Sequence, residues 1–279
     1  MPLDHQPQDD TTARPPAMEP VIRALTSDDE LMRCVQLQRD TWGDDFRELV
    51  APAVLLVVQK VGGLTLGAFD ARGDLVGFVF GITGIRDRQP VHWSHMLAVR
   101  DDWRDRGLGR RLKSAQRTHL REMGIHTAYW SFDPLVARNA HVNLHCLGTT
   151  VIEYVRDMYG HNPTSRTDAV IGSDRFVVAW DVAGATPPPP ANVDPGGPIV
   201  TLAGEPHPAL PDTSPVLLEI PLDIQAVKQR DPLRAVDWRR LTRWAFEHYL
   251  SRGYRVADFR RGGPGVRGRY VLAAGGTRP

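Results

Sequence analysis

Hydrophobic positions repeat at helical spacing in several stretches of the chain, and short apolar runs typical of strands lie between them. Ser27 can cap the first helix, and Glu30 three residues later completes a capping box. The second helix is expected to stop at Pro52, because proline interrupts the hydrogen bonding of a helix interior. The pattern predicts helices over residues 28–41, 44–50, 108–123, 139–147 and 233–252.

The strand-like runs fall into two groups, one in the first two thirds of the chain and one near its end. Residues 71–74 contain a glycine and suit a short hairpin turn between two early strands. Residues 86–90 are expected to form a loop. The predicted strands are residues 21–25, 63–70, 74–83, 91–99, 128–132, 151–159, 175–182, 216–220, 254–259 and 269–272.

Composition divides the chain into four parts. Residues 1–19 are acidic, polar and proline-bearing, and are expected to be a disordered tail. Residues 20–183 form the main predicted domain. Residues 184–215 are rich in proline and glycine and cannot fold alone, so we expect a linker or a long strap over the surface. Residues 216–279 read as an α+β subdomain of about 60 residues, which is too small to be stable by itself. It is expected to pack on the first part or on a partner chain.

The overall composition is that of a globular protein, with 42% hydrophobic and 24% charged residues. A net charge of +1 gives no broad attraction for nucleic acid or for an anionic membrane. No apolar run approaches the roughly 20 residues that span a bilayer. Cys34 and Cys146 lack the spacing of a metal site or a disulfide framework, which favours two reduced thiols in a cytoplasmic protein.

The stretch Arg104-Asp-Arg-Gly107-Leu-Gly109 lies between a predicted strand and a long amphipathic helix. A glycine-bearing turn that leads into a helix leaves backbone N–H groups free and directs the positive end of the helix dipole outward. Such a turn binds phosphate groups, and we call residues 104–109 the cradle. No Lys-Ser or Lys-Thr follows the glycines, which excludes an ATP-type phosphate loop. The acidic residue of a dinucleotide-binding fold is also missing from the following strand.

Val99-x4-Arg104-x-x-Gly107-x-Gly109 resembles the signature with which the GNAT superfamily of acyl-CoA-dependent N-acyltransferases holds the pyrophosphate of coenzyme A. The resemblance covers about residues 20–182 and implies an α+β fold. In it, a mixed, mostly antiparallel sheet is flanked by helices, and here a small C-terminal α+β extension follows. It implies that turn amides bind the pyrophosphate and that backbone groups around residues 97–99 pair with the pantetheine arm, which Asn139 also contacts. The expected coenzyme-binding residues are Leu97, Val99, Arg104, Arg106, Gly107, Leu108, Gly109, Arg110, Asn139 and Asn143.

A narrower resemblance rests on the residues that follow the long helix. Phe132-Asp-Pro-Leu, Arg138-Asn-Ala-x-x-Asn-Leu-x-x-Leu-Gly148, Tyr154 and Tyr159-Gly are similar to a bacterial subgroup of acetyltransferases with a C-terminal extension. Some members of that subgroup are linked to N-acylation of amino acids, including N-succinylation. The similarity suggests a substrate class. Within these motifs, Asp133 is expected to be a turn residue. Arg138 is either a partner for a substrate carboxylate or coenzyme phosphate, or a solvated arginine.

Acyl transfer from a thioester to an amine needs a base for the amine proton and a donor for the tetrahedral oxyanion. A backbone N–H on a splayed strand can serve as that donor. His95 is the first candidate base, because its strand would face the thioester; a core histidine bonded to the backbone is the alternative. His92, Glu48 and Glu153 are further candidates for the base.

The acid that protonates the departing thiolate is less evident. The superfamily's usual tyrosine aligns with Leu144, so Tyr154 or Tyr159 would have to replace it. For Tyr159 the alternative is a half-buried strand tyrosine with a satisfied hydroxyl group.

His141 and His145 are spaced like metal ligands but lack the following glutamate of a zinc protease, so we expect no metal. The aromatic stripe of the C-terminal helix is expected in the core, and comprises Trp238, Trp244, Phe246 and Tyr249.

These observations predict an acyl-CoA-dependent N-acyltransferase. The donor is acetyl-CoA or another acyl-CoA such as succinyl-CoA, and the acceptor is the amine of a small molecule, with amino acids included. No cysteine lies beside the cradle to carry an acyl group, which favours direct attack in a ternary complex. Neither a nucleic acid nor a membrane is expected as a partner. Whether two copies of the chain form a homodimer is left open. Two alternatives are a catalytically weak acyl-CoA sensor or scaffold and a protein N-acetyltransferase.

Overall fold

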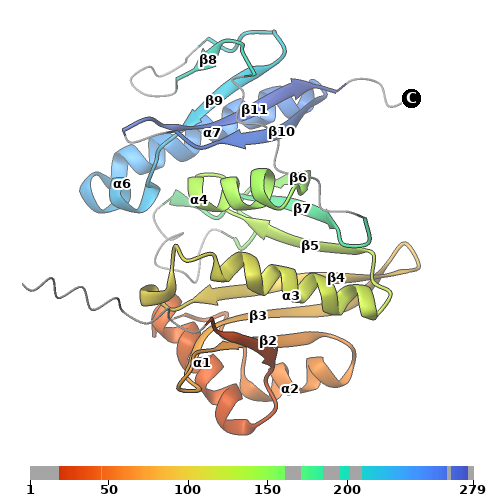
Figure 1. Cartoon of the computed structure of the whole chain (residues 1–279). Coiled ribbons are helices and arrows are strands. Elements are labelled where there is room, and N and C mark those ends of the chain that lie inside the picture. Colours follow the sequence, from red (N-terminus) through yellow and green to blue (C-terminus); the bar gives the residue numbers. More distant parts are fainter. Residues whose placement is uncertain are drawn as a thin grey trace, which may run out of the picture.

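The chain folds around two β-sheets with helices on their faces, as a computed structural model shows (Figure 1). The structure describes residues 19–44, 46–160, 171–184, 195–201, 209–262 and 265–275. The predicted disordered tail lies outside the described residues up to residue 18.

The first sheet has seven strands in the order β1-β2-β3-β4-β5-β7-β6, and β4 and β5 are the parallel neighbours among antiparallel ones. This arrangement confirms the expected mixed, mostly antiparallel sheet. The strands are β1 (Val21–Ala24), β2 (Leu64–Phe69), β3 (Leu75–Arg86), β4 (Gln89–Val99), β5 (Thr127–Phe132), β6 (Thr150–Val155) and β7 (Arg175–Asp181).

Helices cover both faces of this sheet. On one face α1 (Asp28–Trp42) and α2 (Pro52–Lys60) pack against β2, β3 and β4. On the other face α3 (Leu108–Glu122) crosses β2, β3 and β4, and Figure 1 shows it in front of them. The short helix α4 (Ala137–Ala140) continues into a π-helical turn, η2 (His141–Cys146). The sheet therefore separates two apolar cores, one under α1 and α2 and the other under α3 and α4.

The C-terminal part forms a second sheet of four strands in the order β10-β11-β9-β8. Figure 1 places this sheet and α7 beside β6 and β7 of the first sheet, and β10 contacts both β6 and η2. Its elements are β8 (Ile199–Val200), β9 (Val216–Ile220), α6 (Ile224–Arg230), α7 (Pro232–Ser251), β10 (Tyr254–Arg260) and β11 (Gly268–Ala274).

Local signals predicted several elements correctly. Ser27 and Glu30 form the expected capping box at the start of α1. The turn between β2 and β3 is the expected hairpin, with Gly73 at φ +81° and the amide of Gly73 donating to the Asp70 carbonyl at 2.9 Å. Gly124 and Gly148 follow their helices with positive φ. In these places a few neighbouring residues decide the conformation.

Three expectations from the sequence were wrong. No helix forms over the described residues between 44 and 50; the helix instead begins at Pro52, where the missing amide is harmless in a first turn. Residues 86–90 are a tight hairpin turn between long strands rather than a loop, because Asp87 and Arg88 adopt φ of +51° and +62°. The strand predicted over residues 151–159 is too long, because β6 ends at Val155 and residues 156–159 form a turn. The predicted linker, residues 184–215, lies partly outside the described residues, and its described part includes β8, which pairs with β9.

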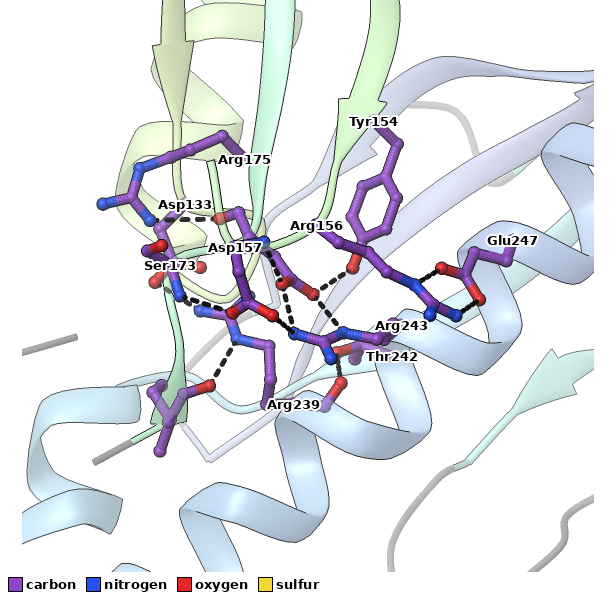
Figure 2. A network of polar contacts seen from close by, with 12 residues as sticks. Asp133, Tyr154, Arg156, Asp157, Ser173, Arg175, Arg239, Thr242, Arg243 and Glu247 are labelled. Carbon is purple, nitrogen blue, oxygen red and sulfur yellow. Dashed lines mark hydrogen bonds and ion pairs between the residues drawn. The ribbon is translucent and has the colours of Figure 1, made fainter. Parts of the chain in front are cut away.

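Two arginines of α7 join the C-terminal part to the first sheet (Figure 2). Arg239 is buried and forms an ion pair with Asp133 at 2.7 Å. Arg243 binds Asp174, and it also binds Asp157 at 3.0 Å. Asp133 lies in the turn that leads from β5 to α4, so the ion pair with α7 holds that turn in place.

An aromatic cluster lies beside these ion pairs. Phe176 of β7 packs against Phe246 of α7 with ring centroids 4.8 Å apart, and Tyr270 of β11 contacts both rings. The hydroxyl group of Tyr270 also donates to the Pro134 carbonyl at 2.7 Å. The two parts of the chain therefore share one core rather than meeting at a polar surface.

Replacing Arg239 with methionine should destabilise the protein by about 3–5 kcal/mol, because it leaves the buried Asp133 carboxylate without its counter-charge. Urea unfolding at neutral pH measures this loss. Arg240→Met is the matched control: Arg240 pairs with Asp237 at 3.7 Å with both side chains about half exposed, and its loss should cost less than about 1 kcal/mol. Equal losses in the two variants would contradict a structural role for the buried pair.

Candidate active site

The turn before α3 presents backbone N–H groups at the start of a helix. Strand β4 ends at Val99, a single 3-10 turn η1 (Asp101–Trp103) follows, and α3 begins at Leu108. Gly107 precedes the helix with φ +78°, a left-handed conformation that glycine adopts without steric cost. No side chain among the described residues caps this end of α3, so its first amides and its positive dipole end are available to an anion.

The arginines of the turn fold back onto their own segment. Arg104 donates from Nε to the Val99 carbonyl at 3.2 Å and forms an ion pair with Asp101 at 2.6 Å. Arg106 stacks over Trp103. A Cβ built on Gly109 would lie 3.7 Å from the side chain of Leu97, which places the first helical turn directly against β4. These contacts fix the turn next to the end of the strand.

Strands β4 and β5 separate beside this turn. Both strands are described in full, and they pair only at Val91–Thr127, His92–Ala128 and Trp93–Tyr129. Beyond these pairs, β4 continues to Val99 in contact with β3, and β5 continues to Phe132 in contact with β7. Helix α3 follows the open end of β4, and α4 follows the open end of β5. The two backbone edges therefore diverge from the sheet towards the turn, and we call the region between these unpaired edges the slot.

A β-bulge interrupts β4 inside this slot. The pairing with β3 passes from Phe80–Met96 directly to Gly81–Ser94, so His95 is the extra residue. His92 and Ser94 lie on the α3 side of the sheet, where both contact Gln116. Met96 belongs to the core under α1 and α2. A bulge interrupts the alternation of side chains along a strand, and here it puts Met96 on the same face as His95, away from α3.

His95 lies with groups of the α1–α2 side. Its ring packs edge-on against Phe80 with centroids 6.0 Å apart. Burial lowers the pKa of His95 below its usual 6.5, and the negative charge of Glu48, between α1 and α2, opposes that shift. His92 lies on the other face, where burial lowers its pKa to about 3. The structure thus brings together His95 and Glu48, and it places His92 apart from them.

Residues 23–145 match the family model of the acetyltransferase (GNAT) family. The chain carries a GNAT domain. A comparison with curated proteins gave no match.

Several solved structures are similar to this chain at low sequence identity. The NatC complex bound to Gag peptide and CoA has 15% identity over 59% of this chain and 99% of that chain, with a TM-score of 0.47. An aminoglycoside 6'-N-acetyltransferase from Enterococcus faecium has 16% identity over 59% and 98%, with a TM-score of 0.44. The ribosomal-protein-S18-alanine N-acetyltransferase from Escherichia coli has 16% identity over 60% and 96%, with a TM-score of 0.43.

The residues expected to bind the coenzyme do not all lie at the slot of the GNAT domain. Leu97, Val99 and the segment 104–110 surround its open end, and Asn139 is exposed at the start of α4. Arg138 forms an ion pair with Asp105 of the turn at 3.4 Å, which connects the two helix starts across the slot. Asn143 is instead buried, and its side-chain oxygen accepts a hydrogen bond from the Trp130 indole at 3.2 Å.

The two candidate acids, Tyr154 and Tyr159, and the candidate base Glu153 lie farther along the sheet. Tyr159 is in the turn after β6, not in a strand, and its hydroxyl oxygen is 3.1 Å from Ser131 Oγ on β5. The Tyr154 hydroxyl group donates a hydrogen bond to Asp174, the carboxylate that also binds Arg243 of α7. Glu153 is exposed on the edge strand β6, which β5 and β7 separate from β4. Of these three residues, Tyr159 has the contact closest to the open end of β5.

The two histidines spaced like metal ligands contact the C-terminal sheet. The rings of His141 and His145 stack 5.0 Å apart, and His145 Nδ1 lies 3.2 Å from Asp258 of β10. In the described part of the chain, no group of three or more His, Cys, Asp or Glu side chains could hold a metal ion. A helix long and apolar enough to cross a membrane is likewise not found among the described residues.

A buried polar cluster on the α3 side of the slot was missed by the sequence reasoning. Its members are Lys113 and Gln116 of α3 and His92 and Ser94 of β4. Lys113 is 7% exposed, and burial lowers the pKa of its amine to about 7. The helical repeat carried the signal, because Lys113 and Gln116 lie seven and four residues before the buried Leu120 and share its face.

The lowered pKa of Lys113 predicts a pH-dependent stability. Below pH 7 the amine is protonated in both states, and the folded protein bears the full cost of burying the charge. As pH rises from about 7 towards 10.5, the folded state releases the proton while the unfolded state keeps it, so the folded state gains stability. Lys113→Met removes this contribution.

We therefore expect the free energy of unfolding of the wild type to rise relative to that of Lys113→Met between pH 7 and pH 9. Urea unfolding of both proteins at several pH values measures the difference, and subtraction cancels the other titrating groups. Parallel curves over this range would show that Lys113 titrates normally.

Proposed function

We propose that the protein transfers an acyl group from acyl-CoA to the amine of a small molecule. The observation that carries the proposal is the uncapped start of α3, which lies at the open end of the slot between β4 and β5. A pyrophosphate bound at the helix start would leave the pantetheine arm directed along the unpaired edge of β4. The family match of residues 23–145 supports acyl transfer from CoA as the activity class.

The bulge supplies the reacting end of this arrangement. The acceptor nitrogen attacks the thioester carbonyl carbon, the C–S bond breaks, and coenzyme A leaves as its thiol. His95 is our candidate to take the proton of the amine, directly or through a water, because its lowered pKa keeps the imidazole neutral near pH 7. An N–H of β4 at the bulge is our candidate for the oxyanion donor.

Arginine and tyrosine pairs support an acceptor that bears a carboxylate, such as an amino acid. Ala128, Trp130 and Phe132 of β5 face the core under α3, so the alternate residues Tyr129 and Ser131 lie on the other face. On that face Arg86 lies over the Tyr129 ring at 4.9 Å, and Arg175 lies over the Tyr159 ring at 5.2 Å. Guanidinium groups held by aromatic rings are suited to carboxylate recognition.

Gly109→Glu should remove coenzyme A binding while preserving α3. A glutamate in the first turn is favourable for a helix, but its charge would repel the pyrophosphate by several kcal/mol, on the order of 100-fold or more in Kd. Calorimetric titration with coenzyme A measures this loss. Gly84→Glu is the matched control, because Gly84 lies on the β3–β4 hairpin with open space around it.

The same two variants and the wild type should be assayed for thiol release from acetyl-CoA and from succinyl-CoA. The acceptor panel pairs each amino acid with the amine that lacks its carboxylate. We expect wild-type turnover with the amino acids and none with Gly109→Glu. Tight coenzyme binding without turnover on any amine would favour an acyl-CoA sensor, which the leucine at position 144 would explain. Unchanged affinity in Gly109→Glu would reject the coenzyme site.

His95→Gln should lower kcat by about 100-fold or more while the Kd for coenzyme A stays unchanged, because a general base acts on the chemical step. The wild type should also lose activity at acidic pH with a pKa below 6.5, as His95 becomes protonated, and the variant should lack that dependence. Thiol release measured from pH 5 to pH 8 tests both points. His126→Gln serves as the control for an exposed histidine. Equal kcat values for His95→Gln and the wild type would exclude His95 as the base.

A further inference from the structure

A buried lysine occupies the point where β4 and β5 part. The last paired residues of the two strands are Trp93 and Tyr129, so Ser94 and Trp130 are the next residue on each side. Lys113 of α3 contacts both of them. Its Nζ donates to Ser94 Oγ at 2.8 Å and lies 3.7 Å from the centroid of the Trp130 ring. Lys113 therefore bridges the two strands at the apex of the slot.

Other hydrogen bonds complete the cluster around this amine. Nζ donates a second bond to Gln116 Oε1 at 3.2 Å, and the side chains of Gln116 and Ser94 bond to each other at 3.1 Å. Gln116 Nε2 lies 3.1 Å from His92 Nε2. The three N–H groups of an ammonium thus have three partners: a hydroxyl oxygen, an amide oxygen and the face of an indole ring.

Burying this amine has a cost that burying an apolar side chain of the same size would not have. None of the described carboxylates forms an ion pair with Lys113, and burial by itself disfavours the ammonium form. The amine instead connects neighbouring elements, because its two hydrogen bonds and its contact with the indole ring are all made in a buried environment. It joins the helix that begins at the cradle to both strands that border the slot.

The connection extends to the second helix at the slot. The Trp130 indole that faces Lys113 donates its N–H to Asn143 Oδ1 in η2 at 3.2 Å. The turn η2 continues α4, which carries Asn139 at its start. Lys113 and Trp130 thereby join the segments on both sides of the slot through buried contacts.

We propose that Lys113 is a positioning residue that sets the divergence of β4 and β5, and with it the slot for the pantetheine arm between the cradle and His95. The proposal rests on the proposed acyl-CoA activity. It assigns to Lys113 an effect on the part of coenzyme A that enters the slot, and none on the nucleotide part that binds at the start of α3.

The test compares two ligands of the full-length protein by calorimetry: coenzyme A, and 3′-phospho-ADP, which is its nucleotide half. Lys113→Met keeps the volume of the side chain and removes the amine, while Ser94 and Gln116 keep their bond to each other. We expect the variant to bind coenzyme A on the order of tenfold more weakly, because a small displacement of a binding surface is enough for such a loss. Its affinity for 3′-phospho-ADP should not change.

Lys60→Met is the matched control, because it removes an exposed ammonium at the end of α2. It should bind both ligands as the wild type does. Ser94→Ala removes the partner of Lys113 on β4 without burying a new group, and it provides the test if Lys113→Met does not fold. It should reproduce the selective loss for coenzyme A, and the double variant should lose no more than Lys113→Met alone.

Equal changes in Kd for the two ligands, or no change for either, would overturn the positioning role. Additive losses in the double variant would also contradict it, because two independent effects would then be at work. A wild-type protein that binds neither ligand would instead refute the coenzyme site itself, so the two failures are distinguishable.

Discussion

The structure depends on one limit to strand pairing: β4 and β5 are hydrogen-bonded for three residue pairs and then separate. Backbone N–H and C=O groups need partners, so strands that part in the middle of a sheet leave edges that water or a ligand must satisfy. Each strand leads from its open end to the start of a helix, and α3 begins there without a side-chain cap. An uncapped helix start, which is our candidate anion site, and an unpaired strand edge therefore lie next to each other. Coenzyme A, with a pyrophosphate joined to an amide-containing arm, matches both.

The C-terminal part supports this arrangement from the side of β5. Arg239 and Tyr270 bind Asp133 and the Pro134 carbonyl, in the turn that carries the chain from β5 into α4. Such a turn would otherwise be a surface loop, and loops move more than the elements they connect. With a buried ion pair and an aromatic cluster on one side and the Arg138–Asp105 contact on the other, the start of α4 is held from two directions. The extension is thus part of the framework of the proposed site.

Sequence reasoning succeeded where a few neighbouring residues decide the conformation. The capping box of Ser27 and Glu30, the Gly73 turn and the glycine turn before α3 are all of this kind. It failed at Pro52, where one residue can end a helix or begin one, and only the packing of the following apolar residues against β2 and β3 decides between them. It also passed over Lys113, because a charged residue in an amphipathic helix ordinarily lies on the exposed face. The tertiary position reverses that expectation through Ser94, Gln116 and Trp130.

The sequence by itself determined the glycine turn before α3, because a glycine at a positive φ followed by a helix start is decided by neighbouring residues. Only the tertiary structure decided which side chains share the slot. Along β4 the pattern of alternation would place His92 and Ser94 on one face and His95 on the other, but whether His95 joins Met96 depends on a bulge opposite β3. Strand order likewise puts Glu153 at the edge of the sheet and brings Tyr159 to Ser131. These outcomes come from pairing between distant segments, which the spacing of residues in a sequence does not record.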